Sequence, residues 1–140
     1  MNQLLISAQD YIENDDIQIL KEFLTDTISG NLSTQSTSKH CLYFYGSGNN
    51  GKSKFLREVI DFVGNDNICY GDNHSNRKLR VFNEVEGSEK VIKRYTSGDD
   101  ISFQCKSNST LICVGNKDWD DLPDEALKNR MTPIKFINTF

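Results

Sequence analysis

The sequence lacks any apolar run that approaches the ~20 residues needed for a membrane-spanning helix. Its first residues, MNQLLISAQDYIENDD, also lack the basic start and the sustained apolar core of a secretory signal peptide. These two absences predict a soluble, intracellular protein with no membrane partner.

An excess of basic residues is missing as well. The chain has 20 acidic and 16 basic side chains, which give it a formal net charge of −4 at pH 7. Proteins that bind nucleic acid through bulk electrostatics are usually basic overall, so this balance argues against that mode of binding. A local basic strip or a pore loop could still contact nucleic acid.

Residue spacings typical of a metal site are absent too. The four cysteines include no C-x-x-C pair, and neither His40 nor His74 has a companion at ligand spacing, so we expect no site built on histidine or cysteine. Cys41, Cys105 and Cys113 lie in strand-like runs, where cysteine behaves as a small apolar residue. We expect these thiols to be reduced and buried.

What the sequence does contain is a complete phosphate-binding loop motif. Residues 46–53 read G-S-G-N-N-G-K-S and match the pattern G-x-x-x-x-G-K-[ST]. Glycines allow the backbone to approach a polyphosphate closely and to point its N–H groups inward. We expect the whole motif to bind nucleotide phosphates: Gly46, Ser47, Gly48, Asn49, Asn50, Gly51, Lys52 and Ser53.

Two residues of this motif have specific expected roles. Lys52 would reach the β- and γ-phosphates, and Ser53 would offer its hydroxyl to Mg²⁺. The apolar run at 41–45 predicts a buried strand before the motif, and the amphipathic pattern from Lys52 to Val63 predicts a helix that Gly64 ends. A ligand-free, glycine-rich turn is the alternative interpretation. The strand–loop–helix context favours a nucleoside triphosphate site, because a helix N-terminus stabilises the phosphate charge.

Two amphipathic helical patterns precede this motif, at about residues 3–13 and 16–29. Residues 31–39 read NLSTQSTSK and show no sustained apolar periodicity, so they predict a polar connector. We therefore divide the chain into an N-terminal helical arm with its connector, residues 1–39, and a core that carries the phosphate-binding loop, residues 40–140.

The rest of the core alternates between strand and helix patterns. Strands are expected at 67–70, 79–82 and 134–137, helices at 89–95 and 124–129, and a hairpin of 101–105 with 110–114 across 106–109. Such alternation behind a phosphate-binding loop predicts an α/β fold with a mainly parallel central sheet.

In such sheets ligands bind beyond the carboxyl ends of the strands, which makes three polar residues candidates. Glu84 follows the strand at 79–82 and could polarise the attacking water or help to hold Mg²⁺; an exposed turn carboxylate is the alternative. Asn116 follows the strand at 110–114 and could orient that water or contact the γ-phosphate, or simply form a turn. Arg130 lies before the last strand, where it could reach a phosphate of a neighbouring subunit or pair with a helix end.

The order of these motifs resembles that of superfamily 3 helicases, which are viral AAA+ ATPases, and most closely that of the helicase part of poxvirus-type and phage primase–helicases. The resemblance rests on a helical lead-in, a loop with asparagine before its second glycine, a strand that ends in glutamate, a lysine–glycine–aspartate segment, a sensor strand and an arginine-containing end. In this sequence these are residues 16–32, 48–53, 81–84, 92–99, 111–116 and 129–136.

The resemblance implies an AAA+-like P-loop NTPase fold that hydrolyses ATP with Mg²⁺. It implies that Lys52 and Ser53 hold phosphate and Mg²⁺, and that Glu84 is the catalytic carboxylate at the metal. Asn116 would be the sensor of the γ-phosphate, and Arg130 would be a finger that acts across a subunit boundary.

The resemblance also implies contacts with nucleic acid. A hairpin near Lys106 would grip single-stranded DNA, and Lys93 belongs to the segment before it; a solvated surface charge is the alternative for both. The family's second motif usually ends in two acidic residues, whereas here Asn83 precedes Glu84. Glu86 would therefore have to compensate in holding Mg²⁺.

Together these expectations describe an ATP-dependent, helicase-like ATPase that forms a homo-oligomer, expected to be a ring, and acts on single-stranded DNA in viral or mobile-element replication. It would work in the host cytoplasm or at a viral replication site, with a primase or another replication protein as a separate partner. The alternative is a small nucleotide-binding accessory or interfering protein without unwinding activity. A metabolite kinase is disfavoured, because the sequence shows neither an acceptor site nor a lid.

Overall fold

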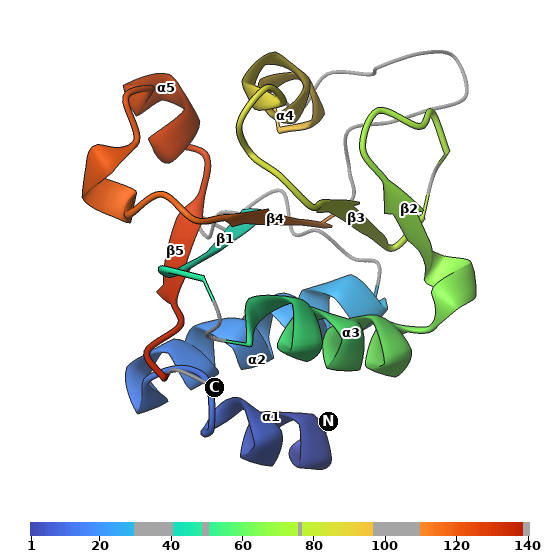
Figure 1. Ribbon diagram of the computed structural model, residues 1–140. Helices are drawn as coiled ribbons and strands as arrows, with labels where there is room; N and C mark the ends of the chain where they lie inside the picture. The colour runs from blue at the N-terminus through green and yellow to red at the C-terminus, as the bar shows by residue number, and fades with distance from the viewer. Residues whose placement is uncertain (30–40, 49–50, 76, 97–109, 139–140) are drawn as a thin grey trace.

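The computed structural model describes residues 1–29, 41–48, 51–75, 77–96 and 110–138. These residues form a five-stranded, fully parallel sheet with helices on both faces (Figure 1). The strand order is β2-β3-β4-β1-β5. The strands are β1 (Cys41–Tyr45), β2 (Ile68–Tyr70), β3 (Leu79–Phe82), β4 (Thr110–Gly115) and β5 (Thr132–Lys135). The expected α/β fold is confirmed.

Continuous apolar sequence explains the central strands. All of β3 and most of β1 and β4 are buried, as is usual for parallel strands covered on both faces. Successive side chains of β1 alternate between two cores, with Leu42 and Phe44 in one and Cys41 and Tyr43 in the other. The sheet therefore needs a helical layer on each side.

One face carries α1 (Asn2–Ala8), α2 (Asn14–Ser29) and α3 (Lys52–Val63), as Figure 1 shows. Aromatic rings fill the space between these helices and the sheet. The ring centroids of Phe44 and Phe136 lie 5.1 Å apart, as do those of Tyr11 and Phe55. The N-terminal helical arm therefore shares a single hydrophobic core with α3 and the sheet.

The opposite face carries α4 (Glu89–Tyr95), the 3-10 turn η2 (Trp119–Asp121) and α5 (Glu125–Lys128) (Figure 1). Ile92, Leu127 and Met131 are buried there against Tyr43 of β1. A second short 3-10 turn, η1 (Asn65–Asn67), connects α3 to β2. None of the helices that the structure describes is both long and apolar enough to cross a membrane.

The prediction that residues 110–114 form the second strand of an antiparallel hairpin is wrong. β4 lies between β3 and β1, and it pairs with both of them in parallel. Residues 110–113 therefore have no free edge for an antiparallel partner. Residues 101–109, which would supply that partner, lie outside the described part of the chain.

The first helix and the last strand end earlier than predicted, by about five and two residues. The first helix ends at Ala8, because Tyr11 and Ile12 turn into the core. The last strand begins and ends two residues earlier than expected. Phe136 already forms an antiparallel bridge with Ile12, and Ile137 N donates a hydrogen bond to Tyr11 O at 3.0 Å. The segment after β5 is thus attached to the turn after α1.

Candidate functional site

The candidate site lies where the chain leaves β1 and β4 toward opposite faces of the sheet. After β1 the chain enters α3 on one face, and after β4 it enters η2 and α5 on the other (Figure 1). In open parallel sheets, ligands bind at such a point, outside the carboxyl ends of the strands. A cavity of about 480 Å³ lies there, lined by residues that follow β1, β3 and β4.

The loop after β1 forms one wall of this cavity. Gly51 has a φ of 81°, in the left-handed region that suits glycine, and α3 begins directly after it. Lys52 and Ser53 open the helix and line the cavity. The positive end of the α3 dipole therefore lies at the cavity, where it would stabilise an anion.

The remaining residues of the loop motif are placed only in part. Gly48 also lines the cavity, Gly46 is buried and Ser47 is exposed. Asn49 and Asn50 lie outside the described residues. The residues of the motif that the structure does describe thus follow the expected strand–loop–helix arrangement.

Lys52 is the buried lysine of this wall, whereas Lys54 on the same helix turn is exposed. The residue is only 7% exposed, and its Nζ donates a hydrogen bond to Gly46 O at 3.0 Å. Burial lowers the pKa of Lys52, because removal from water disfavours the ammonium form. An anion in the cavity would favour that form, so a phosphate and Lys52 would stabilise each other here.

Glu84 and Asn116 form a second wall, at the ends of β3 and β4. Both are exposed, and both line the same cavity as Lys52 and Ser53. The backbone around Glu84 is held to β4, since Phe82 of β3 still pairs with that strand and Val85 N donates to Val114 O at 3.1 Å. The four residues, predicted from three separate motifs, therefore meet in one cavity.

The oxygen ligands available here suit Mg²⁺. Ser53, Glu84 and Glu86 line the cavity and supply hydroxyl and carboxylate oxygens. Within the described residues, no group of three or more His, Cys, Asp or Glu could hold a metal ion alone. Mg²⁺ usually takes one or two carboxylates and completes its shell with phosphate oxygens and water. These residues therefore fit a Mg²⁺ ion that binds together with a nucleotide.

Sequence reasoning missed a group that shapes the end of β4. Tyr43 Oη donates a hydrogen bond to Lys117 O at 2.8 Å, and burial raises the pKa of Tyr43 to about 12. A Cβ atom on Gly115 would lie 2.6 Å from that hydroxyl oxygen, so only glycine leaves the tyrosine room. Glycine at the end of a buried strand could have signalled this close approach.

Lys117 also lies between two cavities. A second cavity of about 310 Å³, next to α4 and α5, shares Val85, Glu86, Lys117 and Leu122 with the first. Lys117 Nζ is 3.9 Å from Glu86 Oε1, and the two side chains are 48% and 63% exposed. Ion pairs this exposed contribute little to stability. The Lys117 side chain is therefore held only weakly by Glu86.

Arg130 and Lys93 lie away from the first cavity and join α4 to α5. Arg130 Nη1 donates to Lys93 O at 3.3 Å and to Thr96 Oγ1 at 3.4 Å, at the C-terminal end of α4. Lys93 Nζ lies 2.5 Å from Asp124 Oδ2, and this hydrogen bond is the main reason why the pKa of Asp124 is lowered. Within this chain, Arg130 makes the helix-end pairing considered as the alternative. Lys106 lies outside the described residues.

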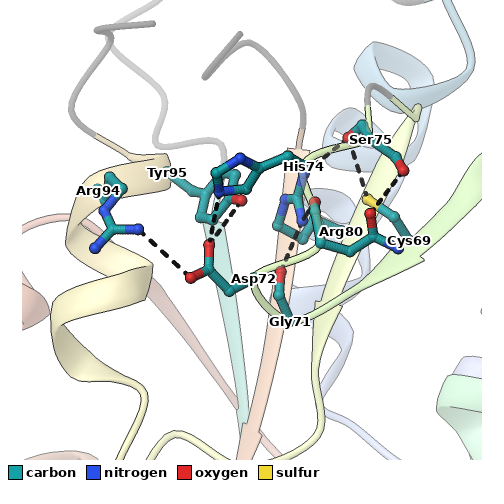
Figure 2. Close-up of polar contacts among 9 residues, drawn as sticks. Cys69, Gly71, Asp72, His74, Ser75, Arg80, Arg94 and Tyr95 are labelled. Atoms are coloured by element: carbon teal, nitrogen blue, oxygen red, sulfur yellow. Dashed lines mark hydrogen bonds and ion pairs between the residues drawn. The ribbon is translucent and has the colours of Figure 1, made fainter. Parts of the chain in front are cut away.

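A buried arginine fixes the loop after β2, and sequence reasoning missed it (Figure 2). Arg80 Nη1 donates to the carbonyls of Gly71 and Asn73 at 2.7 and 2.6 Å, and Nη2 donates to Ser75 O at 2.9 Å. The guanidinium also lies 3.8 Å from the centre of the Tyr95 ring. An arginine inside an apolar strand pattern was the available signal.

The same loop is attached to α4 by Asp72 (Figure 2). Its carboxylate accepts a hydrogen bond from Tyr95 Oη at 2.9 Å, and it pairs with Arg94 Nη1 at 3.4 Å and His74 Nε2 at 3.5 Å. None of these residues lines either cavity. We therefore assign this cluster a structural role, that of fastening the loop after β2 to β3 and α4.

Neither protein-family models nor curated proteins show a match to this chain. The resemblance to superfamily 3 helicases therefore rests on the order of motifs within this sequence.

Proposed function

We propose that the chain is a P-loop NTPase that binds ATP with Mg²⁺ in the cavity after β1 and hydrolyses it. One observation carries this proposal. Lys52, Ser53, Glu84 and Asn116 come from three separate segments of the chain, yet all line the same cavity. A glycine-rich turn without a ligand would not require a carboxylate and an amide to converge on it.

Each residue has a role in such a reaction. Lys52 and the N-terminus of α3 would hold the β- and γ-phosphates. Ser53 and Glu84 would hold Mg²⁺, which when bound neutralises charge on the phosphate oxygens. Glu84 would also orient the attacking water and accept its proton, and Asn116 would contact the γ-phosphate.

We further propose that the chain acts as an oligomeric, helicase-like ATPase on single-stranded DNA in viral or mobile-element replication. The order of motifs supports this reading. A small nucleotide-binding accessory protein is the second candidate, and a specific observation favours it: Arg130 and Lys93 both have partners within the chain. A finger or a DNA contact would have to exchange those partners for new ones.

ATP turnover measured with and without single-stranded DNA, together with the mass of the assembly, tests this proposal. We expect turnover that depends on Mg²⁺, rises with DNA and accompanies an oligomer. A strictly monomeric mass with turnover that ignores DNA would favour the accessory protein. Absence of nucleotide binding would overturn both readings.

A mixing experiment tests whether subunits share a site. Lys52→Ala protein has a disabled loop and an intact Arg130, and Arg130→Ala protein has the reverse. If Arg130 completes the neighbour's site, the mixture regains part of the activity that each variant lacks. A mixture that remains inactive would contradict the shared site.

A further inference from the structure

We infer that Lys117 is a second phosphate-binding cation, which contacts the terminal phosphate of the nucleotide from within the same chain. This inference rests on the proposed function and adds to it. Lys117 would make the site prefer a nucleoside triphosphate to a diphosphate.

The position of Lys117 in the cavity supports this role. The cations that line the cavity, among the residues the structure describes, are Lys52, Lys54 and Lys117. Lys52 and Lys54 both belong to the first turn of α3, whereas Lys117 follows β4 on the wall of Glu84 and Asn116. A triphosphate held at α3 and reacting near Glu84 would present its terminal group between these two walls.

The backbone of Lys117 is fixed in place. Its carbonyl accepts the hydrogen bond from the buried hydroxyl of Tyr43, and Gly115 allows the tyrosine to reach it. Tyr43 lies in the middle of β1, which pairs with β4 along its whole length. The Cα atom of Lys117 is therefore set by the same two strands that position the loop and Asn116.

The side chain of Lys117, in contrast, is free to change partners. Its ion pair with Glu86 spans 3.9 Å between half-exposed groups, which makes it a weak interaction. A terminal phosphate carries more negative charge than a single carboxylate and offers several acceptor oxygens. Charge-assisted hydrogen bonds to such a group are the strong ones, so the ammonium would exchange Glu86 for phosphate.

The local charge balance points in the same direction. Glu84 and Glu86 place two carboxylates on this wall, and carboxylates repel the terminal phosphate. A cation on this wall offsets that repulsion. A diphosphate held at α3 lacks the group that would reach Lys117, so its affinity would depend less on this cation.

Calorimetric titration with Mg²⁺ and two nucleotides, ADP and the non-hydrolysable triphosphate AMP-PNP, tests this inference. We expect Lys117→Ala to weaken binding of AMP-PNP about tenfold or more, the scale of a lost charge-assisted hydrogen bond, while ADP affinity stays near that of the parent. Lys117→Arg should recover part of the lost affinity. Lys90→Ala is the matched control, because Lys90 is an exposed lysine that lines the second cavity and not the first.

Two results would overturn the inference. One is an unchanged AMP-PNP affinity in Lys117→Ala, and the other is an equal loss for both nucleotides, which would indicate only a general charge effect. Thermal melting of each variant shows whether the fold is intact. If the proposed function itself is wrong, the parent protein will bind neither nucleotide. That result differs from both of the results above.

Discussion

At the scale of single residues, the two walls of the cavity differ in how far their charged side chains are exposed. Lys52 is buried, and its Nζ donates a hydrogen bond to Gly46 O in the same loop, which suits a group proposed to bind phosphate. Glu84 is exposed to the cavity, which suits a group that must reach water and Mg²⁺. The two side chains therefore predict different consequences when they are removed.

Replacing Glu84 with glutamine tests the proposed role of Glu84 in hydrolysis. The amide keeps the size of the side chain but cannot accept a proton, so ATP should still bind while hydrolysis slows about a hundredfold or more. Single-turnover hydrolysis and calorimetric binding measure the two effects separately. Glu89→Gln, on α4 beside the second cavity, is the control, and an unchanged turnover number in Glu84→Gln would reduce Glu84 to a turn residue.

Tyr43 gives the protein a predictable response to alkaline pH. Its folded-state pKa of about 12 exceeds the ordinary value of 10.0, so the fold favours the neutral phenol. That stabilisation is complete below pH 10 and is lost as the pH rises from 10 to about 12. Urea unfolding across this interval should therefore show a larger loss of stability in the parent than in Tyr43→Phe.

Tyr43→Phe should also be less stable than the parent at neutral pH. Tyr43→Phe removes the hydrogen bond to Lys117 O, which should lower the free energy of unfolding by about 1 kcal/mol. The pKa values of Tyr11 and Tyr45 are raised as well, but these residues are present in both proteins. Identical pH profiles for the two proteins would contradict the role assigned to Tyr43.

At the scale of elements, most of the fold was predictable because periodicity and glycine signals act locally. The predicted bounds of α3 and α4 agree with the structure, since each has an apolar stripe and clear ends. The hairpin prediction failed for a non-local reason. Which strands flank β4 depends on segments far away in the sequence, and no local pattern encodes that choice.

The residues of the candidate site were likewise predictable only where local patterns mark them. Its loop, carboxylate and asparagine follow strand ends, so the sequence indicated Lys52, Ser53, Glu84 and Asn116. Lys117 was missed, because its place depends on Tyr43 of the neighbouring strand β1, for which Gly115 was the one local sign. A local window can hint at a contact between elements but does not identify the partner.

Substituting Arg80 tests how the loop after β2 is attached to β3. Arg80→Leu places an apolar side chain at this buried position of β3 but removes the donors for three backbone carbonyls, so it should lower the free energy of unfolding by about 3 kcal/mol or more. Arg77→Leu is the matched control, because Arg77 is exposed and donates a hydrogen bond to Asp66 O at 2.9 Å. Equal urea midpoints for the two variants would contradict the role of Arg80.

Substituting Arg130 tests how much the junction of α4 and α5 contributes to stability. Arg130→Ala removes hydrogen bonds at the C-terminal end of α4 and should lower the free energy of unfolding by about 1 kcal/mol. ADP affinity should not change, because Arg130 does not line the cavity. Chemical denaturation and calorimetry check both statements, with the exposed Arg94→Ala as a comparison. A loss of ADP affinity without a loss of stability would place Arg130 at the nucleotide instead.

At the scale of the whole molecule, the strand order creates the site. The order β2-β3-β4-β1-β5 puts β1 beside β4, and their following segments diverge to opposite faces (Figure 1). The loop after β1 and the residues after β3 and β4 therefore converge at one edge. Helices cover both faces of the sheet behind this edge (Figure 1).

Calorimetric titration of Mg–ATP into the parent protein and into Lys52→Ala tests the central claim most directly. The parent should bind with one site per chain, and Lys52→Ala should lose binding while it keeps its fold, since the substitution removes a buried cation from the cavity wall. Arg57→Ala, an exposed position on the same helix, should bind like the parent. Equally tight binding of Mg–ATP by Lys52→Ala would contradict the assignment of this cavity as a nucleotide site.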